Sequence, residues 1–199
     1  MGVPEFQTAR LILRPMGLKD APALQRQFPL WENVRLLASS VPWPYPADGA
    51  ETHVRDVALP AVERGEAWHW TIRLRTAPDD LIGAIGMMVG ENENRGFWLA
   101  PQWRGQGLMT EAAERVTAFW FEELGMARLR VPKAAENFAS RRVSEKEGMR
   151  VVALEERRYV QGVLPTEIWE ITAEEWRDRE MAKGMKEEEA GIVRSHSSR

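Results

Sequence analysis

The chain has 199 residues, of which 44% are hydrophobic and 29% charged, and its formal net charge at pH 7 is −3. This length suits one sizeable core and is short for two domains, while the small acidic excess argues against nucleic-acid binding, which normally needs a clear basic excess. The absence of cysteine excludes disulfides, thiolate nucleophiles and cysteine-ligated metal sites.

Nothing in the sequence predicts secretion or membrane insertion. Residues 1–5 do not join a basic region to an apolar run, so we expect no secretory signal. No stretch approaches the roughly 18 uncharged apolar residues of a membrane span, so we expect a cytoplasmic protein. Beyond Trp176 the composition shifts to Glu, Lys, Arg and Ser. We therefore expect a domain over residues 1–176 and a charged tail over 177–199, helical at first and then disordered.

The first elements of the chain follow from local signals. Residues 10–15 alternate apolar and basic side chains, which predicts a strand. Asp20 is typical of a helix N-cap, and Gly65 is typical of the residue that ends a helix. The expected order is a strand at 10–15, a helix at 20–28, a proline-rich loop at 29–50 and a helix at 50–64.

An antiparallel meander is predicted next. The tryptophans Trp68 and Trp70 alternate with His69, so they share one face of a strand and His69 lies on the other. Short polar segments rich in Asp and Asn indicate the turns. The expected order is a strand at 68–74, a turn at 78–80, a strand at 81–87, a turn at 92–94 and a strand at 97–100.

The pattern then changes to a crossover. Apolar residues recur at helical spacing from Met109 to Leu124, and Gly125 ends the helix. A strand at 129–131 is expected to run parallel to the strand at 97–100, since a helix connects them. A helix at 137–147 and strands at 149–154 and 167–172 complete the prediction. The fold class is therefore α/β with a mixed sheet.

The most informative segment is the turn at residues 102–107, Gln-Trp-Arg-Gly-Gln-Gly, which precedes the long helix. Gly105 and Gly107 permit close backbone approach and positive φ angles. The start of a helix leaves several N–H groups without internal partners, so this turn predicts an anion cradle. A dinucleotide fingerprint would need glycine where Thr110 stands, and a phosphate-binding loop of the Walker type would need Gly-Lys-Ser/Thr, which is absent.

Two motifs resemble a known family. Gln102-x-x-Gly105-x-Gly107 is similar to the coenzyme A signature of the GNAT acetyltransferase superfamily. The segment from Asn137 to Met149 resembles the Asn-x-x-Ser…Lys-x-Gly-Phe motif of the branch that contains ribosomal-protein alanine N-acetyltransferases. The resemblance spans residues 8–176. It implies the GNAT fold, a mostly antiparallel central sheet with one parallel, splayed strand pair and flanking helices.

The resemblance also implies acetyl-CoA as cosubstrate, held between the splayed strands at 97–100 and 129–131. Pro132 supports this independently, because proline cannot donate to a strand ladder. For Asn137 a role as helix N-cap is equally open. The implied cofactor-binding residues are Phe97, Trp98, Leu99, Arg104, Gly105, Gln106, Gly107, Leu108, Met109, Thr110, Asn137 and Ser140.

The implied reaction is direct attack of an amine on the thioester. A backbone N–H near Leu99 is the candidate oxyanion donor, and Ser140 is the candidate contact of the leaving thiolate. Many family members carry a tyrosine where this chain has Ser144, so the proton donor stays open, and Tyr159 is a second candidate. Candidates for the base are Glu93 and His69; a turn residue and a structural histidine are the alternatives.

Several points stay open at this level. A non-catalytic acyl-CoA-binding sensor or partner protein is the alternative to an enzyme. The acceptor is a primary amine, on a protein N-terminus or a small molecule, and the loop with Trp31 and Trp43 is expected to form its wall. We expect a monomer or a homodimer that binds neither nucleic acid nor membrane. No metal-ligand spacing is visible, and His53 and His196 have no evident partner.

Overall fold

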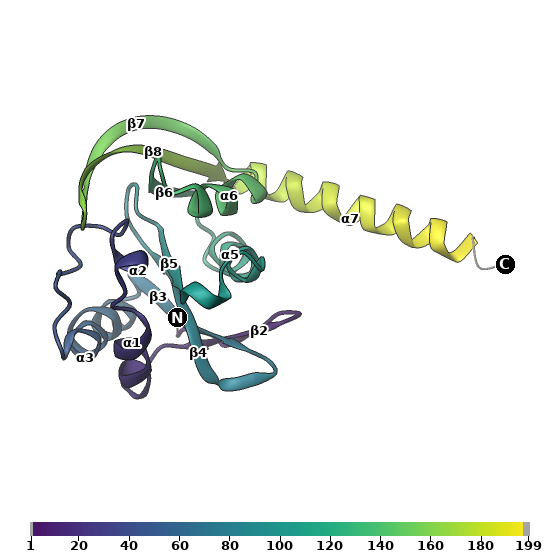
Figure 1. The fold of residues 1–199 in the computed structure, drawn as a ribbon. Helices are drawn as coiled ribbons and strands as arrows, with labels where there is room; N and C mark the ends of the chain where they lie inside the picture. The colour runs from purple at the N-terminus through teal and green to yellow at the C-terminus, as the bar shows by residue number, and fades with distance from the viewer. Residues whose placement is uncertain (1, 197–199) are drawn as a thin grey trace.

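The computed structural model describes residues 2–196, with side chains up to residue 186. Residues 197–199, at the end of the tail that was expected to become disordered, lie outside the described residues. Within them, no helix is long and apolar enough to cross a membrane. The described chain forms two antiparallel sheets with helices packed around them, and Figure 1 shows the sheets one above the other.

The first sheet carries the predicted meander. Its strand order is β1-β2-β3-β4-β5, and every neighbouring pair is antiparallel. The bounds are β1 Phe6–Gln7, β2 Leu11–Pro15, β3 Ala67–Leu74, β4 Ala77–Met88 and β5 Arg95–Leu99.

The second sheet has three strands in the order β6-β8-β7, also antiparallel. The bounds are β6 Arg128–Ala134, β7 Arg150–Tyr159 and β8 Gly162–Thr172. Because β6 is an edge strand, one of its sides faces β5 of the first sheet. The fold class is confirmed, although β5 and β6 form no continuous ladder, and the splay separates the chain into two sheets.

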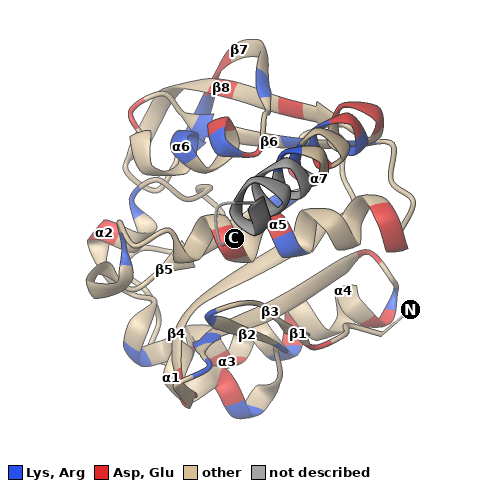
Figure 2. Ribbon diagram, turned by 90° about the vertical axis from the view of Figure 1, so that its right-hand side faces the viewer, with Lys and Arg blue, Asp and Glu red and all other residues tan. Residues whose placement is uncertain are grey.

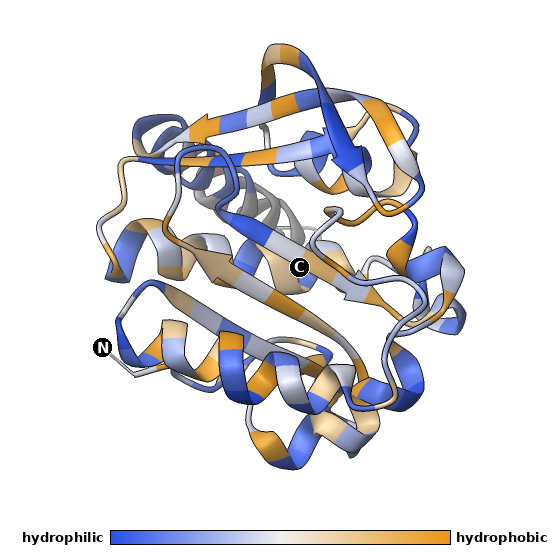
Figure 3. Ribbon diagram, turned by 90° about the vertical axis from the view of Figure 1, so that its left-hand side faces the viewer, coloured by the Kyte–Doolittle hydropathy of each residue, from blue (hydrophilic) through white to orange (hydrophobic). Residues whose placement is uncertain are grey.

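Helices cover both faces of the first sheet. The helix α5 lies on one face, and α1, α3 and α4 lie on the other (Figure 1). Along the helices, hydrophobic and hydrophilic residues alternate, as expected for elements buried on one side only (Figure 3). The helix bounds are α1 Ala21–Gln27, α2 Trp31–Val34, α3 Gly49–His53, α4 Leu59–Glu63, α5 Leu108–Ala118, α6 Phe138–Lys146 and α7 Ala173–His196; η2 Val54–Ala58 joins α3 to α4, and η4 Phe119–Glu123 extends α5.

The core lies between α5 and the first sheet. Trp68 and Trp70 of β3 both contact Phe119, with ring centroids 6.0 and 5.6 Å apart. Ala112 and Val116 on the same side of α5 have no exposed surface. The predicted faces of β3 and of the long helix are therefore confirmed.

A tie at one end joins the two sheets. The N–H of Asn94 donates to the carbonyl of Arg130 at 2.8 Å, and the N–H of Arg130 donates to Oδ1 of Asn94 at 2.8 Å. The Asn94 amide group also donates to the carbonyl of Gly90 at 2.7 Å. Further along β6, Pro132 has no N–H to offer. The strands therefore meet at Asn94 and separate beyond it.

A buried ion pair lies next to Asn94, at the start of β5. The guanidinium of Arg95 binds both carboxylate oxygens of Glu147, at 2.6 and 2.7 Å, and both side chains are fully buried. The hydroxyl of Thr117 donates to the same carboxylate at 2.9 Å. The pair links the start of β5 to α5 and to the end of α6.

One predicted turn is wrong. Residues 78–80 lie inside β4, and the chain turns earlier, at residues 75–76. The β3–β4 ladder is irregular there, with register shifts on both sides of Arg73. Arg73 is buried, and it pairs with Asp20 at 2.6 Å and donates to the carbonyl of Asp79 at 2.7 Å. Residues 78–80 have the polar composition of a turn, but these contacts stabilise them as the end of a strand. Asp20, the predicted N-cap, uses its side chain for Arg73 and for the N–H of Gly17.

The hairpin β7–β8 is longer than predicted. The segment 155–166 was outside the predicted strands, but β7 continues to Tyr159 and β8 begins at Gly162. Residues 155–158 are all charged, and Gly162 and Pro165 interrupt the segment that follows, so no alternation of apolar residues reveals the strands. The loop at 29–50 contains the short helix α2, and β1 was not predicted. Figure 2 shows acidic and basic residues interspersed on the described part of α7, which extends away from the domain in Figure 1.

The buried pair gives a test of the fold. Glu147→Gln leaves the Arg95 charge in the core without its counter-charge, so we expect the free energy of unfolding to fall by about 3–5 kcal/mol. The matched control is Glu66→Gln, which removes an ion pair with Arg64 whose side chains are more than half exposed and should cost under about 1 kcal/mol. Urea denaturation measures both. Equal losses would contradict the structural role of the buried pair.

Candidate active site

The separation of β5 from β6 opens a cavity of about 720 Å³. It is bounded by β5, by β6, and by the starts of α5 and α6. Phe97 and Leu99 line it from β5, and Pro132 and Lys133 line it from β6. The predicted splayed pair therefore encloses a slot long enough to hold an extended ligand.

The free edge of β5 offers backbone groups to this slot. The N–H of Ala100 donates to the carbonyl of Ile82 in β4 at 2.9 Å. Since directions alternate along an antiparallel strand, the N–H and C=O groups of Phe97 and Leu99 point the opposite way, into the slot. The carbonyl of Leu99 accepts from Nε of Arg104 at 3.1 Å, so its N–H is the group left for a ligand.

The glycine turn supplies a second set of donors. Gly105 and Gly107 have φ values of +75° and +77°, which only glycine adopts without strain. In the described part of the chain, no hydrogen bond is donated by the backbone N–H groups of residues 105–110. All of these residues except Gln106 line the slot at the start of α5, where the helix dipole adds partial positive charge.

Arg10 supports the turn from behind. Its Nη1 donates to the carbonyl of Gln106 at 2.9 Å, and its Nε pairs with Glu111 at 2.7 Å. These contacts hold the turn's carbonyl away from the slot. Burial is the largest single effect on the pKa of Glu111 and raises it. The hydrogen bonds from Thr8 and Arg10 together outweigh burial, so the pKa is lowered.

Arg104 is used differently from the expected rim charge. Its guanidinium donates to the carbonyl of Leu99, to the carbonyl of Glu32 and to Oδ1 of Asn33. Burial lowers the pKa of Arg104, with Glu32 opposing and Arg35 reinforcing the effect. The side chain therefore fastens the α2 loop to the end of β5, and its charge is largely satisfied within the protein.

The start of α6 brings Asn137 and Ser140 to the slot. Oδ1 of Asn137 accepts from the N–H of Ser140 at 3.2 Å, so the N-cap role is confirmed. The Ser140 hydroxyl accepts from Nζ of Lys133 at 2.6 Å. Ser144 is fully buried and does not line the slot, whereas Tyr159 lines it and shares a hydrogen bond with Thr166 at 2.8 Å.

Sequence reasoning missed Lys133. The signal was its register, because Leu129, Val131 and Lys133 alternate along β6 and therefore face the same way. The first two are buried apolar residues, so a lysine in the third place is expected inside the protein too. Its side chain is indeed buried.

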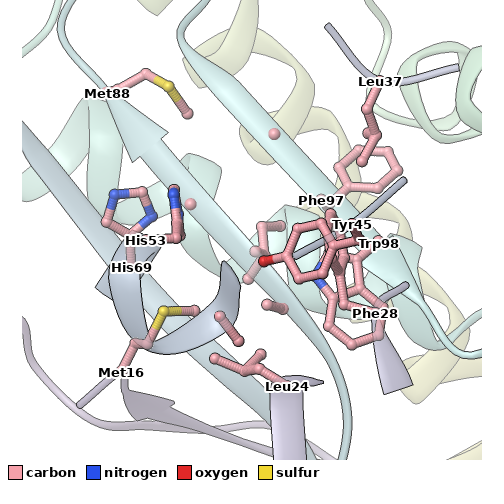
Figure 4. A pocket seen from close by; sticks show the side chains of 15 residues that line it. Met16, Leu24, Phe28, Leu37, Tyr45, His53, His69, Met88, Phe97 and Trp98 are labelled. Atoms are coloured by element: carbon pink, nitrogen blue, oxygen red, sulfur yellow. The ribbon is translucent and has the colours of Figure 1, made fainter. Parts of the chain in front are cut away.

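A second cavity, of about 200 Å³, adjoins the slot at β5, and Figure 4 shows the side chains that line it. It shares five lining residues with the slot, Leu37, Met88, Gly96, Phe97 and Trp98. The remaining wall comes from β3, β4, α1, α3 and the proline-rich loop. Among the described residues that line it there is no carboxylate, and most of the wall is apolar.

Two histidines stand in this second cavity. The ring centroids of His53 and His69 are 6.5 Å apart, so His53 does have a partner, which sequence reasoning missed because α3 brings it there. Burial, with the neighbouring His53, lowers the pKa of His69 to about 4, and burial lowers the pKa of His53. His69 is therefore neutral at physiological pH and able to accept a hydrogen bond.

The other candidates lie less favourably. The side chain of Glu93 is 62% exposed and pairs with that of Arg157. Both residues line the slot, whereas the two histidines line the second cavity. The rings of Trp31 and Trp43 pack against each other in a tilted arrangement, with their centroids 5.3 Å apart. Both residues are about 40% exposed and line neither cavity. From the same loop it is Tyr45 that lines the second cavity.

The sequence matches one family model and one curated relative. Residues 10–150 match the family described as "Acetyltransferase (GNAT) domain". The relative is the "Putative ribosomal N-acetyltransferase YdaF" of Bacillus subtilis (strain 168), which is 33% identical over 72 residues. That match covers 34% of this chain and 39% of the relative, so it spans well under half of either protein.

Solved structures agree with the fold. The ribosomal-protein-S5-alanine acetyltransferase of Vibrio fischeri has a TM-score of 0.74 at 12% identity, covering 87% of this chain and 98% of that one. RimJ of Mycobacterium smegmatis, solved with CoA-disulfide, has a TM-score of 0.72 at 20% identity and covers 87% and 89%. At this identity the likeness concerns the fold. With the family match over residues 10–150, the chain belongs to the GNAT acetyltransferase family.

Proposed function

We propose that this acetyltransferase moves the acetyl group of acetyl-CoA to a primary amine, on a protein N-terminus or on a small molecule. The proposal rests on the backbone N–H groups of residues 105–110, which donate no hydrogen bond within the described part of the protein and lie beside the 720 Å³ slot. Backbone donors at a helix start bind a diphosphate well. The chemistry of the slot thus fits the charged end of coenzyme A.

The slot fits the rest of the cosubstrate as well. Phe97 and Leu99 present backbone groups toward it, as a chain of amides requires, and Asn137 stands on the opposite wall. The second cavity meets the slot at Phe97 and Trp98. An acceptor in that cavity would therefore approach the thioester across β5, where both reactants are held close together.

The second cavity suits a neutral amine. An apolar wall disfavours the ammonium form, so it lowers the pKa of an entering amine and increases the share that can attack. His69, itself neutral, is placed to accept a hydrogen bond from the amine. The Leu99 N–H is the candidate donor to the developing oxyanion. Ser140, at the slot wall, is the candidate contact for the departing thiolate.

The first test is turnover with a panel of amines. We expect acetyl-CoA to release its thiol with short peptides that have an uncharged N-terminal residue, and more slowly with spermidine, because the cavity wall contains no carboxylate to hold extra positive charge. A thiol-reactive dye reads only the released coenzyme A, since the chain has no cysteine. Tight binding of acetyl-CoA without thiol release by any acceptor would instead favour a sensor.

A charge reversal tests the anion cradle. Gly107→Glu places a carboxylate beside the free N–H groups, and we expect the Kd for coenzyme A to rise about 100-fold or more, or about 2.7 kcal/mol. Gly65→Glu is the matched control, because Gly65 also has a positive φ, of +70°, and open space around it. Both variants carry similar backbone strain. Calorimetric titration with coenzyme A measures the difference, and equal affinities would contradict the cradle.

The burial of His69 predicts a pH effect on stability. Its folded pKa is about 4, below the ordinary value of about 6.5. Between these values the unfolded chain binds more protons, so the stabilisation is complete above about pH 6.5 and is lost as the pH falls. The loss should reach about 2 kcal/mol at pH 5. In His69→Phe this loss of unfolding free energy at low pH should be absent. Urea denaturation of both proteins at pH 7.5 and pH 5 measures it, and the same pH dependence in both would mean that the cavity is well hydrated.

A further inference from the structure

Lys133 is buried in the wall of the slot. The residue is 4% exposed, and Nζ lies 2.6 Å from the hydroxyl of Ser140. The same Nζ is 5.2 Å from the centre of the Phe97 ring, across the slot on β5. Lysine is seldom fully buried unless it is paired, so this position calls for an explanation.

The charged groups that face Lys133 do not neutralise it. Arg95 and Glu147 are its charged neighbours, but the carboxylate of Glu147 is already bound by Arg95 and Thr117. Among the described residues, no carboxylate forms a salt bridge with Lys133. Burial first, and then Arg95, lower the pKa of Lys133 to about 7, with Glu147 opposing them. The ammonium can therefore give up a proton near neutral pH.

Acetyl transfer to an amine produces a thiolate that needs a proton. A serine hydroxyl alone is a weak acid, because losing its proton leaves an alkoxide. An ammonium donating to that same oxygen removes the difficulty, since it replaces the proton as it leaves. We propose that Lys133 supplies, through the hydroxyl of Ser140, the proton taken up by the coenzyme A thiolate; this rests on the N-acetyltransferase function proposed above.

The proton balance of the step is complete. The amine nitrogen forms a bond to the acetyl carbon, and the bond from that carbon to sulfur breaks with its electron pair on sulfur. The Ser140 proton passes to sulfur, and a proton from Lys133 passes to the Ser140 oxygen. Lys133 becomes neutral and is reprotonated from solvent, which meanwhile receives the proton lost by the amine. Lys133 is thus a positioning residue that acts through Ser140.

Kinetics of Lys133→Met test this role. We expect kcat with acetyl-CoA and the best peptide acceptor to fall on the order of 100-fold, the usual contribution of a positioned proton donor, with the KM for acetyl-CoA changed less than about threefold. The double variant Lys133→Met/Ser140→Ala should be no slower than the slower single variant, because the two act as a unit. Lys19→Met, which changes an exposed lysine, should behave like the wild type.

The pH profile separates a proton donor from a structural lysine. The ratio of the wild-type kcat to that of Lys133→Met cancels the titration of the acceptor amine, so it should fall as the pH rises through about 7. A pH-independent ratio, a wild-type kcat, or losses that multiply in the double variant would overturn the proposal. The melting temperature of Lys133→Met should not fall, because the substitution removes a buried charge that lacks a carboxylate partner.

A binding experiment on the wild-type protein needs no acceptor amine. It can test the proposal even if the variants fail to fold. In the wild-type protein, the ¹⁵N signal of Lys133 Nζ should respond to coenzyme A and much less to desulfo-coenzyme A, which lacks the sulfur. An identical response to both ligands would overturn the placement of Lys133 near the thiol. If this response is seen while every amine fails to turn over, the proposed function is wrong and the placement of Lys133 stands.

Discussion

The structure depends on two strands that are joined at one end and kept apart at the other. Asn94 exchanges two hydrogen bonds with Arg130, and the Arg95–Glu147 pair holds the start of β5 against α5 and α6. Past this point β6 contains Pro132, which has no N–H for a ladder. The β5 edge is therefore left without a protein partner in the middle of the molecule. An unpaired strand edge normally attracts another chain, and here a slot of about 720 Å³ beside the edge leaves room for a ligand.

In the proposed function, the same arrangement places both reactants. One side of β5 faces the slot and the glycine turn, and the other faces the smaller cavity with its two histidines. The electrostatic character of the two spaces differs. The turn at 105–110 offers dipoles and N–H donors suited to an anion, whereas the second cavity is apolar and contains neutral imidazoles. A carrier with a negatively charged end and an acceptor that must lose its proton are thus each given the environment they need.

Much of this was accessible from the sequence. The alternation around Trp68 and Trp70, the helical spacing after Met109 and the two glycine-containing motifs predicted the fold class, the cradle and the start of α6, because each depends on local periodicity or on glycine itself. What could not be predicted depends on tertiary contacts. The strand at 78–80 has the composition of a turn, and the buried Arg73 explains why it is not one. Likewise His53 reaches His69 only because α3 packs there.

The central claim is that the free N–H groups at 105–110 and on β5 are the binding surface for coenzyme A. The most direct measurement is an amide NMR titration of the wild-type protein with coenzyme A. We expect the largest shifts, and slowed exchange with solvent, at Gly105 to Thr110 and at Phe97 and Leu99. Saturable binding that leaves these amides unchanged and perturbs another surface would contradict it.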